Sequence, residues 1–159
     1  MIKVAILTVS DSCSAQSRED LSGQTIKNFL PADKFMICEY KITADEQEDI
    51  KKALIGFADE AKVDIVFTTG GTGLGPRDVT PEATAAVCEK MVPGLAEAMR
   101  FEGLKKTKNA MLSRGVAGIR GNTLIINLPG SPKAVKESLE VILEVLPHAR
   151  DMLLGRGHK

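Results

Sequence analysis

Three short apolar runs rich in β-branched residues constrain the fold of this chain more than any other feature. They lie at residues 2–9, 63–68 and 123–128. Runs of this length and composition are typical of strands buried in a parallel sheet, because both faces of such a strand are covered. Strand character returns at residues 34–42, which predicts a fourth strand.

Segments with helical spacing of apolar residues lie between these runs. One such segment covers 21–30 and is ended by Pro31. A second follows a capping box predicted at Thr43 and Glu46 and extends to about residue 61. Thr80 and Pro81 predict the N-cap and first residue of another helix. Further helices are predicted at 93–106 and after residue 132, the last ended or kinked at Pro147. Residues 110–121 carry three glycines and give no clear pattern.

Strands alternating with helices predict an α/β fold of three layers, with a mainly parallel sheet, helices on both faces and Rossmann-like connections. A chain of 159 residues suits one compact domain, which we expect to span 1–159. Ligands of such folds gather at the carboxyl ends of the strands. The turns at 10–11, 69–78 and 129–132 are therefore the candidate binding segments.

The charge balance points to a small polar ligand. The chain has 21 basic and 21 acidic residues, so no overall field attracts it to nucleic acid or to an anionic membrane. No uninterrupted apolar run approaches the roughly 18 residues of a membrane span. The three cysteines lack C-x-x-C spacing, which supports neither a disulfide framework nor a zinc site and favours the reducing cytoplasm.

The turn at 69–78 has three glycines in four residues and a fourth at Gly75. Glycines let backbone N–H groups converge on an anion without obstruction by β-carbons, and the following helix directs its positive end toward the same place. We therefore expect this turn to bind a phosphate group. Because Pro76 and Arg77 follow Gly75, the turn is not a Walker A loop, and its spacing and place after the third run also fit a dinucleotide fingerprint poorly.

Two acids and a base near this turn suggest phosphoryl chemistry. Arg77 could brace a phosphate while Asp78 holds Mg²⁺, which prefers one or two carboxylates plus substrate oxygens. The alternative for Asp78 is an ordinary turn residue bonded to backbone. Asp45 is a second carboxylate at a strand end, although an acid near the start of a helix is favoured by the macrodipole in any case. Ser131 fits an N-cap before Pro132 equally well.

The polar loop at 10–20 is long enough to be functional, and a merely flexible surface loop is the alternative. It begins with Ser10 and Asp11. Cys13 lies in this loop without a histidine near it in sequence, so a nucleophilic cysteine is not predicted.

The motifs together resemble the molybdopterin adenylyltransferase (MogA/MoaB type) family of molybdenum cofactor biosynthesis. The matching segments are Thr8-Val9-Ser10-Asp11, Asp20-x-Ser22-Gly23, Thr69-Gly70-Gly71-Thr72-Gly73-x-x-x-Arg77-Asp78-x-Thr80-Pro81-Glu82, and the run from Ala117 to Pro132. The resemblance therefore covers nearly the whole chain.

The resemblance implies a nucleotidyltransferase that uses ATP as co-substrate and Mg²⁺ as cofactor. AMP would pass from ATP to the terminal phosphate of molybdopterin, and pyrophosphate would leave. The same resemblance implies a homotrimer in the cytoplasm, with contacts to molybdopterin synthase and the molybdenum insertase, and with no nucleic acid or membrane partner.

The resemblance also assigns site residues. Asp45 and Asp78 become the catalytic and metal-binding acids, although this chain has Ala44 where the family often has proline before its acid. The substrate-binding residues it implies are Ser10, Asp11, Gly70, Gly71, Thr72, Gly73, Arg77, Ser131 and Pro132.

Two other functions stay open at this stage. The same fold serves as a non-catalytic molybdopterin-binding or assembly module in larger proteins, and a glycine turn alone does not name the base of its nucleotide.

Overall fold

The computed structural model describes residues 1–157, and in them the strands form one six-stranded sheet of order β2-β1-β3-β6-β5-β4. Strands β2, β1, β3 and β6 pair in parallel, and β5 pairs antiparallel with both β6 and β4. In sheet order, the strands are β2 (Phe35–Thr43), β1 (Ile2–Val9), β3 (Ile65–Thr69), β6 (Thr123–Leu128), β5 (Ala117–Arg120) and β4 (Lys90–Met91). The predicted mainly parallel sheet is confirmed.

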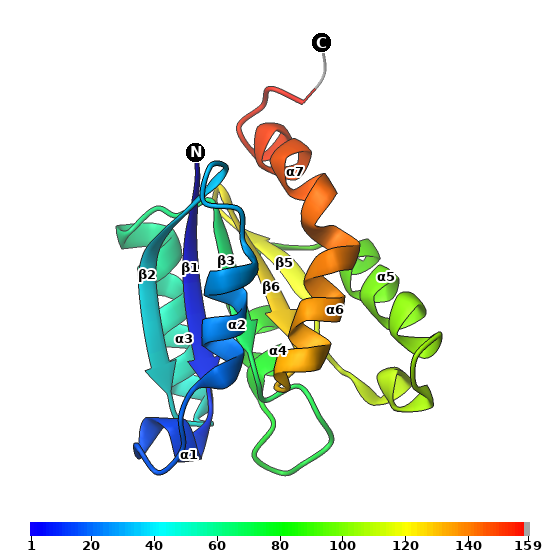
Figure 1. The fold of residues 1–159 in the computed structure, drawn as a ribbon. Helices are drawn as coiled ribbons and strands as arrows, with labels where there is room; N and C mark the ends of the chain where they lie inside the picture. Colours follow the sequence, from blue (N-terminus) through cyan, green and yellow to red (C-terminus); the bar gives the residue numbers. More distant parts are fainter. Residues whose placement is uncertain (158–159) are drawn as a thin grey trace.

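Alternate residues of the central strands supply two separate cores. In β1, Ile2, Val4 and Ile6 face one core, and Ala5 and Leu7 face the other. Helices cover both faces of the sheet, which makes the predicted three layers (Figure 1). On the first face lie α2 (Leu21–Phe29), α5 (Pro93–Leu104) and α6 (Pro132–Ile142), and on the second lie α3 (Gln47–Ile55) and α4 (Thr80–Val87).

The parallel register brings the candidate turns to one edge. Thr8 of β1 pairs with Thr69 of β3, which in turn pairs with Leu128 of β6. Because these strands end level with one another, the segments that follow them meet at the lower edge of the sheet in Figure 1. The glycine turn and the short helix α1 (Asp11–Ser14) both lie there.

Two predicted caps are wrong. Thr43 is still part of β2, so α3 begins at Gln47 after Glu46 and has no side-chain cap. Thr80 is already helical, and its buried hydroxyl donates to the carbonyl oxygen of Gly70 at 3.0 Å instead of capping α4. Val79 occupies the N-cap position. The strand before α3 therefore continues further than the local pattern indicates, whereas α4 begins one residue earlier.

The segments without a clear pattern contain short elements. The loop at 10–20 includes α1, capped by Ser10, whose Oγ accepts a hydrogen bond from the Cys13 N–H at 3.2 Å. Residues 108–112 form a 3₁₀ turn before β5. Pro147 lies in the first turn of α7 (Leu146–Leu153), after α6 has ended and a 3₁₀ turn has followed it. The proline thus starts a helix.

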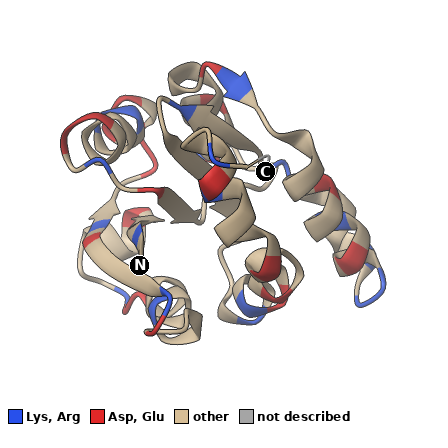
Figure 2. Ribbon diagram, turned by 90° about the horizontal axis from the view of Figure 1, so that it is seen from above, with Lys and Arg blue, Asp and Glu red and all other residues tan. Residues whose placement is uncertain are grey.

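Charges of both signs are distributed over the helices and loops (Figure 2), in line with the balanced composition. Within residues 1–157, no helix combines the length and apolar character needed to cross a membrane.

Candidate functional site

A small polar cavity of about 200 Å³ lies at the carboxyl edge of the parallel strands. Five of the predicted residues line it: Ser10, Asp45, Gly70, Gly71 and Asp78. The other residues in its wall are Thr8, Val9, Cys13, Arg18, Glu19, Asp20, Leu21, Ser22, Thr69 and Gly130. The structure thus brings Asp45 and Asp78 to the same cavity, whose other acids, Glu19 and Asp20, were not predicted.

The glycine turn needs its glycines for close packing. Gly70 and Gly71 have φ values of +94° and +68°, a region that other residues rarely adopt. A β-carbon on Gly70 would lie 2.3 Å from the carbonyl oxygen of Val9, and one on Gly71 would lie 2.3 Å from Oγ1 of Thr80. The turn therefore rests directly on the end of β1 and the start of α4.

The same turn leaves backbone donors for an anion. No hydrogen bond within residues 1–157 uses the N–H groups of Gly71, Thr72 or Gly73. The Gly70 N–H is taken by the Leu128 carbonyl at 3.3 Å. Because neighbouring free N–H groups in a turn attract oxyanions, the phosphate prediction keeps its physical basis.

Asp78 folds back over the turn. Its Oδ2 accepts a hydrogen bond from the Gly75 N–H at 2.8 Å, and a β-carbon on Gly73 or Gly75 would lie 2.9 Å from the same oxygen. Asp78 therefore does bond to backbone, as the simpler interpretation expects, but to the turn before it. This bond fixes a carboxylate that also lines the cavity.

Asp45 lies over the other side of the turn. Its Oδ2 accepts from the Asp11 N–H at 2.9 Å, its own N–H donates to Asp11 Oδ1 at 3.0 Å, and its Oδ1 would lie 3.3 Å from a β-carbon on Gly71. Burial raises the pKa of Asp45 above its usual range, and the charges of Asp11 and Asp78 raise it further. An acid crowded in this way favours a cation as a neighbour.

Arg77 is engaged by carboxylates. It donates to both oxygens of Asp11, at 2.8 and 3.0 Å, and to Glu46 at 2.9 Å. The hydrogen bonds from Arg77 lower the pKa of Asp11. To contact a phosphate as well, Arg77 must give up or share one of these partners. Its role in substrate binding stays a prediction.

The remaining predicted residues lie outside the small cavity. Ser131 caps α6 by accepting from the Ala134 N–H at 3.2 Å, with Pro132 as the first helical residue. Thr72 is buried, and its carbonyl accepts from the Arg114 N–H at 2.9 Å. Gly73 faces a second cavity instead. Asp11 does not line the small cavity either, but it is hydrogen-bonded to Asp45, which does, and to Arg77.

Sequence reasoning missed a buried network beneath the small cavity. Asp20, only 7% exposed, accepts from the hydroxyls of Thr8 (2.7 Å) and Tyr40 and from the Gly23 N–H (2.9 Å). Burial and the Asp20 carboxylate raise the pKa of Tyr40. Ser22 donates to the Gly130 carbonyl at 2.5 Å. Thr8, Asp20 and Ser22 all belong to the matching motifs, which were the available signal, but no role was assigned to them.

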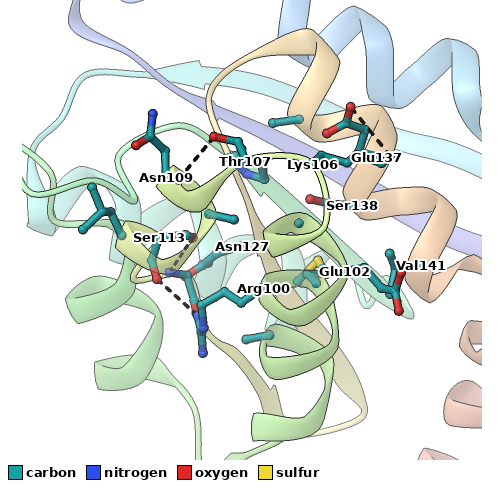
Figure 3. Close-up of a pocket in the computed structure, with 18 of the residues that line it drawn as sticks. Arg100, Glu102, Lys106, Thr107, Asn109, Ser113, Asn127, Glu137, Ser138 and Val141 are labelled. Carbon is teal, nitrogen blue, oxygen red and sulfur yellow. Dashed lines mark hydrogen bonds and ion pairs between the residues drawn. The ribbon is translucent and has the colours of Figure 1, made fainter.

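A larger cavity of about 660 Å³ lies on the other side of the glycine turn, between α5, α6 and the 3₁₀ turn at 108–112 (Figure 3). The two cations in its wall have partners: Lys106 lies 3.7 Å from Glu137, and Arg100 donates to the carbonyls of Ser113 and Gly115 at 3.3 and 2.8 Å. The turn divides the two cavities, because Gly70 and Gly71 line one and Gly73 the other.

The donor set suits Mg²⁺ bound together with a phosphate. Within residues 1–157 there is no cluster of three or more His, Cys, Asp or Glu side chains that could cage a metal ion. Mg²⁺ is commonly held by one or two carboxylates, with water and substrate phosphate completing its octahedron. Asp45 and Asp78, both lining the small cavity beside free N–H groups, match that requirement.

Comparisons with known proteins identify the family of the chain. The family model described as "Probable molybdopterin binding domain" matches residues 5–148. The molybdopterin adenylyltransferase of Helicobacter pylori is 47% identical over 156 residues, which cover 97% of this chain and 89% of that protein. The enzyme of the same name from Haemophilus influenzae is 42% identical over 143 residues, covering 88% and 72%.

A solved structure of a relative has the same fold as this chain. The crystal structure of the molybdopterin biosynthesis enzyme MoaB from Thermus thermophilus matches with a TM-score of 0.93 and 51% identity, covering all of both chains. The α/β prediction and the family resemblance are therefore confirmed, and the chain belongs to the family of molybdopterin-binding domains that includes the MogA/MoaB-type proteins.

Proposed function

We propose that the chain is a molybdopterin adenylyltransferase of molybdenum cofactor biosynthesis, the function named for its relatives in H. pylori and H. influenzae. An oxygen of the terminal phosphate of molybdopterin bonds to the α-phosphorus of ATP, and the bond from that phosphorus to the pyrophosphate oxygen breaks. The observation that carries the proposal is the pair of carboxylates, Asp45 and Asp78, held over a glycine turn with free N–H groups.

The glycine turn holds phosphate in this proposal. The N–H groups of Gly71, Thr72 and Gly73 donate to phosphate oxygens and keep them in one orientation. The turn cannot shift easily, because Gly70 and Gly71 pack against Val9 and Thr80. A fixed set of donors stabilises charge that develops on the phosphates during transfer.

Asp45 and Asp78 hold Mg²⁺ in this proposal. The ion, when bound, neutralises phosphate charge and aligns the two reacting groups. Asp78 is oriented by the Gly75 N–H, and Asp45 by the Asp11 N–H, so neither acid depends on the metal for its position. Ser10 lines the cavity beside them, and Arg77 and Asp11 form the rim.

The two substrates together need more room than the small cavity offers. At about 200 Å³ it suits phosphates and a metal ion, whereas ligand pockets usually measure roughly 300–1,000 Å³. The larger cavity begins at Gly73 and Pro129, next to the turn. We place the ring system of one substrate there, with its phosphate extending over the turn.

The assembly and location of the protein are also proposals, carried by the family resemblance. We propose a cytoplasmic homotrimer that exchanges molybdopterin with its synthase and with the molybdenum insertase. Large apolar side chains of α5 and the 3₁₀ turn after it support a contact between copies: Phe101 is 65% exposed, Met111 59% and Leu104 41%.

Pyrophosphate release tests the function. The purified chain, given ATP, Mg²⁺ and molybdopterin, is expected to release pyrophosphate far faster than an Asp78→Ala variant, and to stop when Mg²⁺ is chelated. Tight binding of molybdopterin without pyrophosphate release, at every Mg²⁺ concentration, would show a binding or assembly module instead. Competition with GTP and NAD identifies the nucleotide.

A further inference from the structure

Arg114, in the segment that the sequence left unassigned, makes four hydrogen bonds to the glycine turn and the helix after it. Its N–H donates to the Thr72 carbonyl at 2.9 Å. Its guanidinium donates to the Gly73 carbonyl and the Asp78 carbonyl, both at 2.7 Å, and to the carboxylate of Glu82. Arg114 therefore connects the glycines at 72–73 with Asp78, at the end of the glycine turn, and with Glu82, near the start of α4.

These bonds determine which way the backbone donors point. In a trans peptide the C=O of one residue and the N–H of the next point in opposite directions. Because Arg114 holds the Thr72 and Gly73 carbonyls, the N–H groups of Gly73 and Leu74 are directed away from it. The Gly73 carbonyl oxygen, which would repel a phosphate, is held by the positively charged guanidinium, and the Thr72 carbonyl oxygen is held by the Arg114 backbone N–H.

Arg114 is itself fixed by its neighbours. Arg100 of α5 donates to the carbonyls on either side of it, those of Ser113 (3.3 Å) and Gly115 (2.8 Å). The N–H of Val116, two residues on, donates to the side chain of Asn127 in β6 at 3.2 Å. The guanidinium thus extends from a backbone that a helix and a strand hold in place, as a supporting residue requires.

A lysine could not make the same contacts. The guanidinium is a planar fork whose donors reach three acceptors here, whereas an ammonium is a compact point charge. The hydrogen bond from Arg114 also lowers the pKa of Glu82, which keeps that partner ionised.

We propose that Arg114 is a positioning residue for adenylyl transfer, which holds the turn at 72–78 so that its N–H groups face phosphate and Asp78 faces the metal. This inference rests on the proposed function for its effect on the rate, but its structural part, the hold on the turn, can be measured without substrates.

Arg120 provides a matched control. It donates to both oxygens of Asp59, at 3.0 and 2.7 Å, and to the Val87 carbonyl at 3.0 Å. It therefore binds a carboxylate and a backbone carbonyl, as Arg114 does, but at the opposite end of α4 and outside both cavities. Arg120→Met removes a comparable set of bonds without touching the glycine turn.

The test compares the full chain with its Arg114→Met, Arg114→Lys and Arg120→Met variants by hydrogen exchange, melting temperature and pyrophosphate release. For Arg114→Met we expect amide exchange of Gly75, Asp78 and Thr80, whose N–H groups are hydrogen-bonded within the turn, to rise about 10-fold or more. We expect kcat to fall about 100-fold, with a smaller change in KM for ATP. Arg114→Lys recovers only part of the rate, and Arg120→Met changes the melting temperature alone.

Unchanged exchange in the turn of Arg114→Met overturns the proposal, as does full recovery of the rate by Arg114→Lys. If Arg114→Met does not fold, Arg114→Lys carries the same test. If the unmodified chain releases no pyrophosphate, the proposed function fails, while the exchange measurement still decides whether Arg114 holds the turn.

Discussion

The two cavities beside the glycine turn differ in the state of their charges. In the larger one, Lys106 is paired with Glu137 and Arg100 is bonded to carbonyls. In the smaller one, Asp45 and Asp78 lie close enough for the charge of one to raise the pKa of the other. Perturbed acids in a cleft are typical of functional sites. The larger cavity therefore offers room for a ligand, whereas the uncompensated acids mark the smaller cavity as the place of the proposed reaction.

The comparison predicts its largest effect at Asp78. Asp78→Asn keeps an oxygen that can accept from the Gly75 N–H but loses the charge that we propose holds Mg²⁺. We expect pyrophosphate release to fall by about 10²–10³-fold, the range found when a preorganised electrostatic group is removed. The measurement is the initial rate at saturating ATP and molybdopterin.

Asp59→Asn is the control for that loss. Asp59 is another acid bound to an arginine, Arg120, but it lies outside both cavities. Its variant should keep the original rate within about twofold, since surface changes away from a site have small effects. Equal rates in Asp78→Asn and the unmodified chain would mean that the small cavity does not carry the chemistry.

A second prediction concerns the larger cavity. Ala134 of α6 lines it, and a phenylalanine there fills part of the space proposed for a ring system. We expect Ala134→Phe to raise KM about 10-fold for one substrate and to leave kcat nearly unchanged, because only binding is lost. Which KM rises identifies the substrate.

Lys133→Phe is the matched variant, because residue 133 precedes Ala134 in α6 but does not line the cavity. A large fall in kcat for Ala134→Phe, with both KM values unchanged, would contradict the division between a binding cavity and a reacting one.

Arg77, at the rim of the small cavity, is expected to give a smaller effect. Its charge is shared with Asp11 and Glu46, so it adds less to phosphate binding than a free arginine would. We expect Arg77→Met to raise KM for ATP about threefold, most clearly at low salt. No change in KM at any ionic strength would remove Arg77 from the substrate-binding residues.

The four parallel strands were predictable because their signal is local, whereas the short strands β4 and β5 were not predicted. A β-branched apolar run such as residues 2–9 identifies a buried strand without any knowledge of its partners, and the level ends of parallel strands then place the turns. Helix starts were less predictable. Threonine is a common N-cap residue, but the Thr80 hydroxyl donates to the Gly70 carbonyl, and this contact depends on how the turn folds back.

Contacts between distant segments explain what the sequence could not show. Asp78 could be proposed from its place after the glycine turn and Asp45 from the family resemblance, whereas Asp20 is bonded to Thr8 and Tyr40, which lie 12 and 20 residues away. Arg114 lies 36 residues from Asp78. No local periodicity records such pairings, so these residues required the fold.

The smallest predicted effect concerns stability, and it tests whether the small cavity is strained by its charges. Because burial and neighbouring acids raise the folded-state pKa of Asp45, its ionisation opposes folding. Its contribution to stability is full below the unfolded pKa of about 4 and is lost as pH rises through the raised folded pKa.

Asp45→Asn keeps an oxygen for the Asp11 N–H and removes this penalty. At pH 7 we expect its melting temperature to exceed that of the unmodified chain by on the order of 2 °C, since the group is partly solvated. Thermal melts of both chains from pH 4 to 8, without Mg²⁺, should show the difference shrinking on acidification. A difference that is constant with pH would mean that Asp45 carries no electrostatic penalty, and the attraction of this cavity for a cation would then have to come from Asp78 alone.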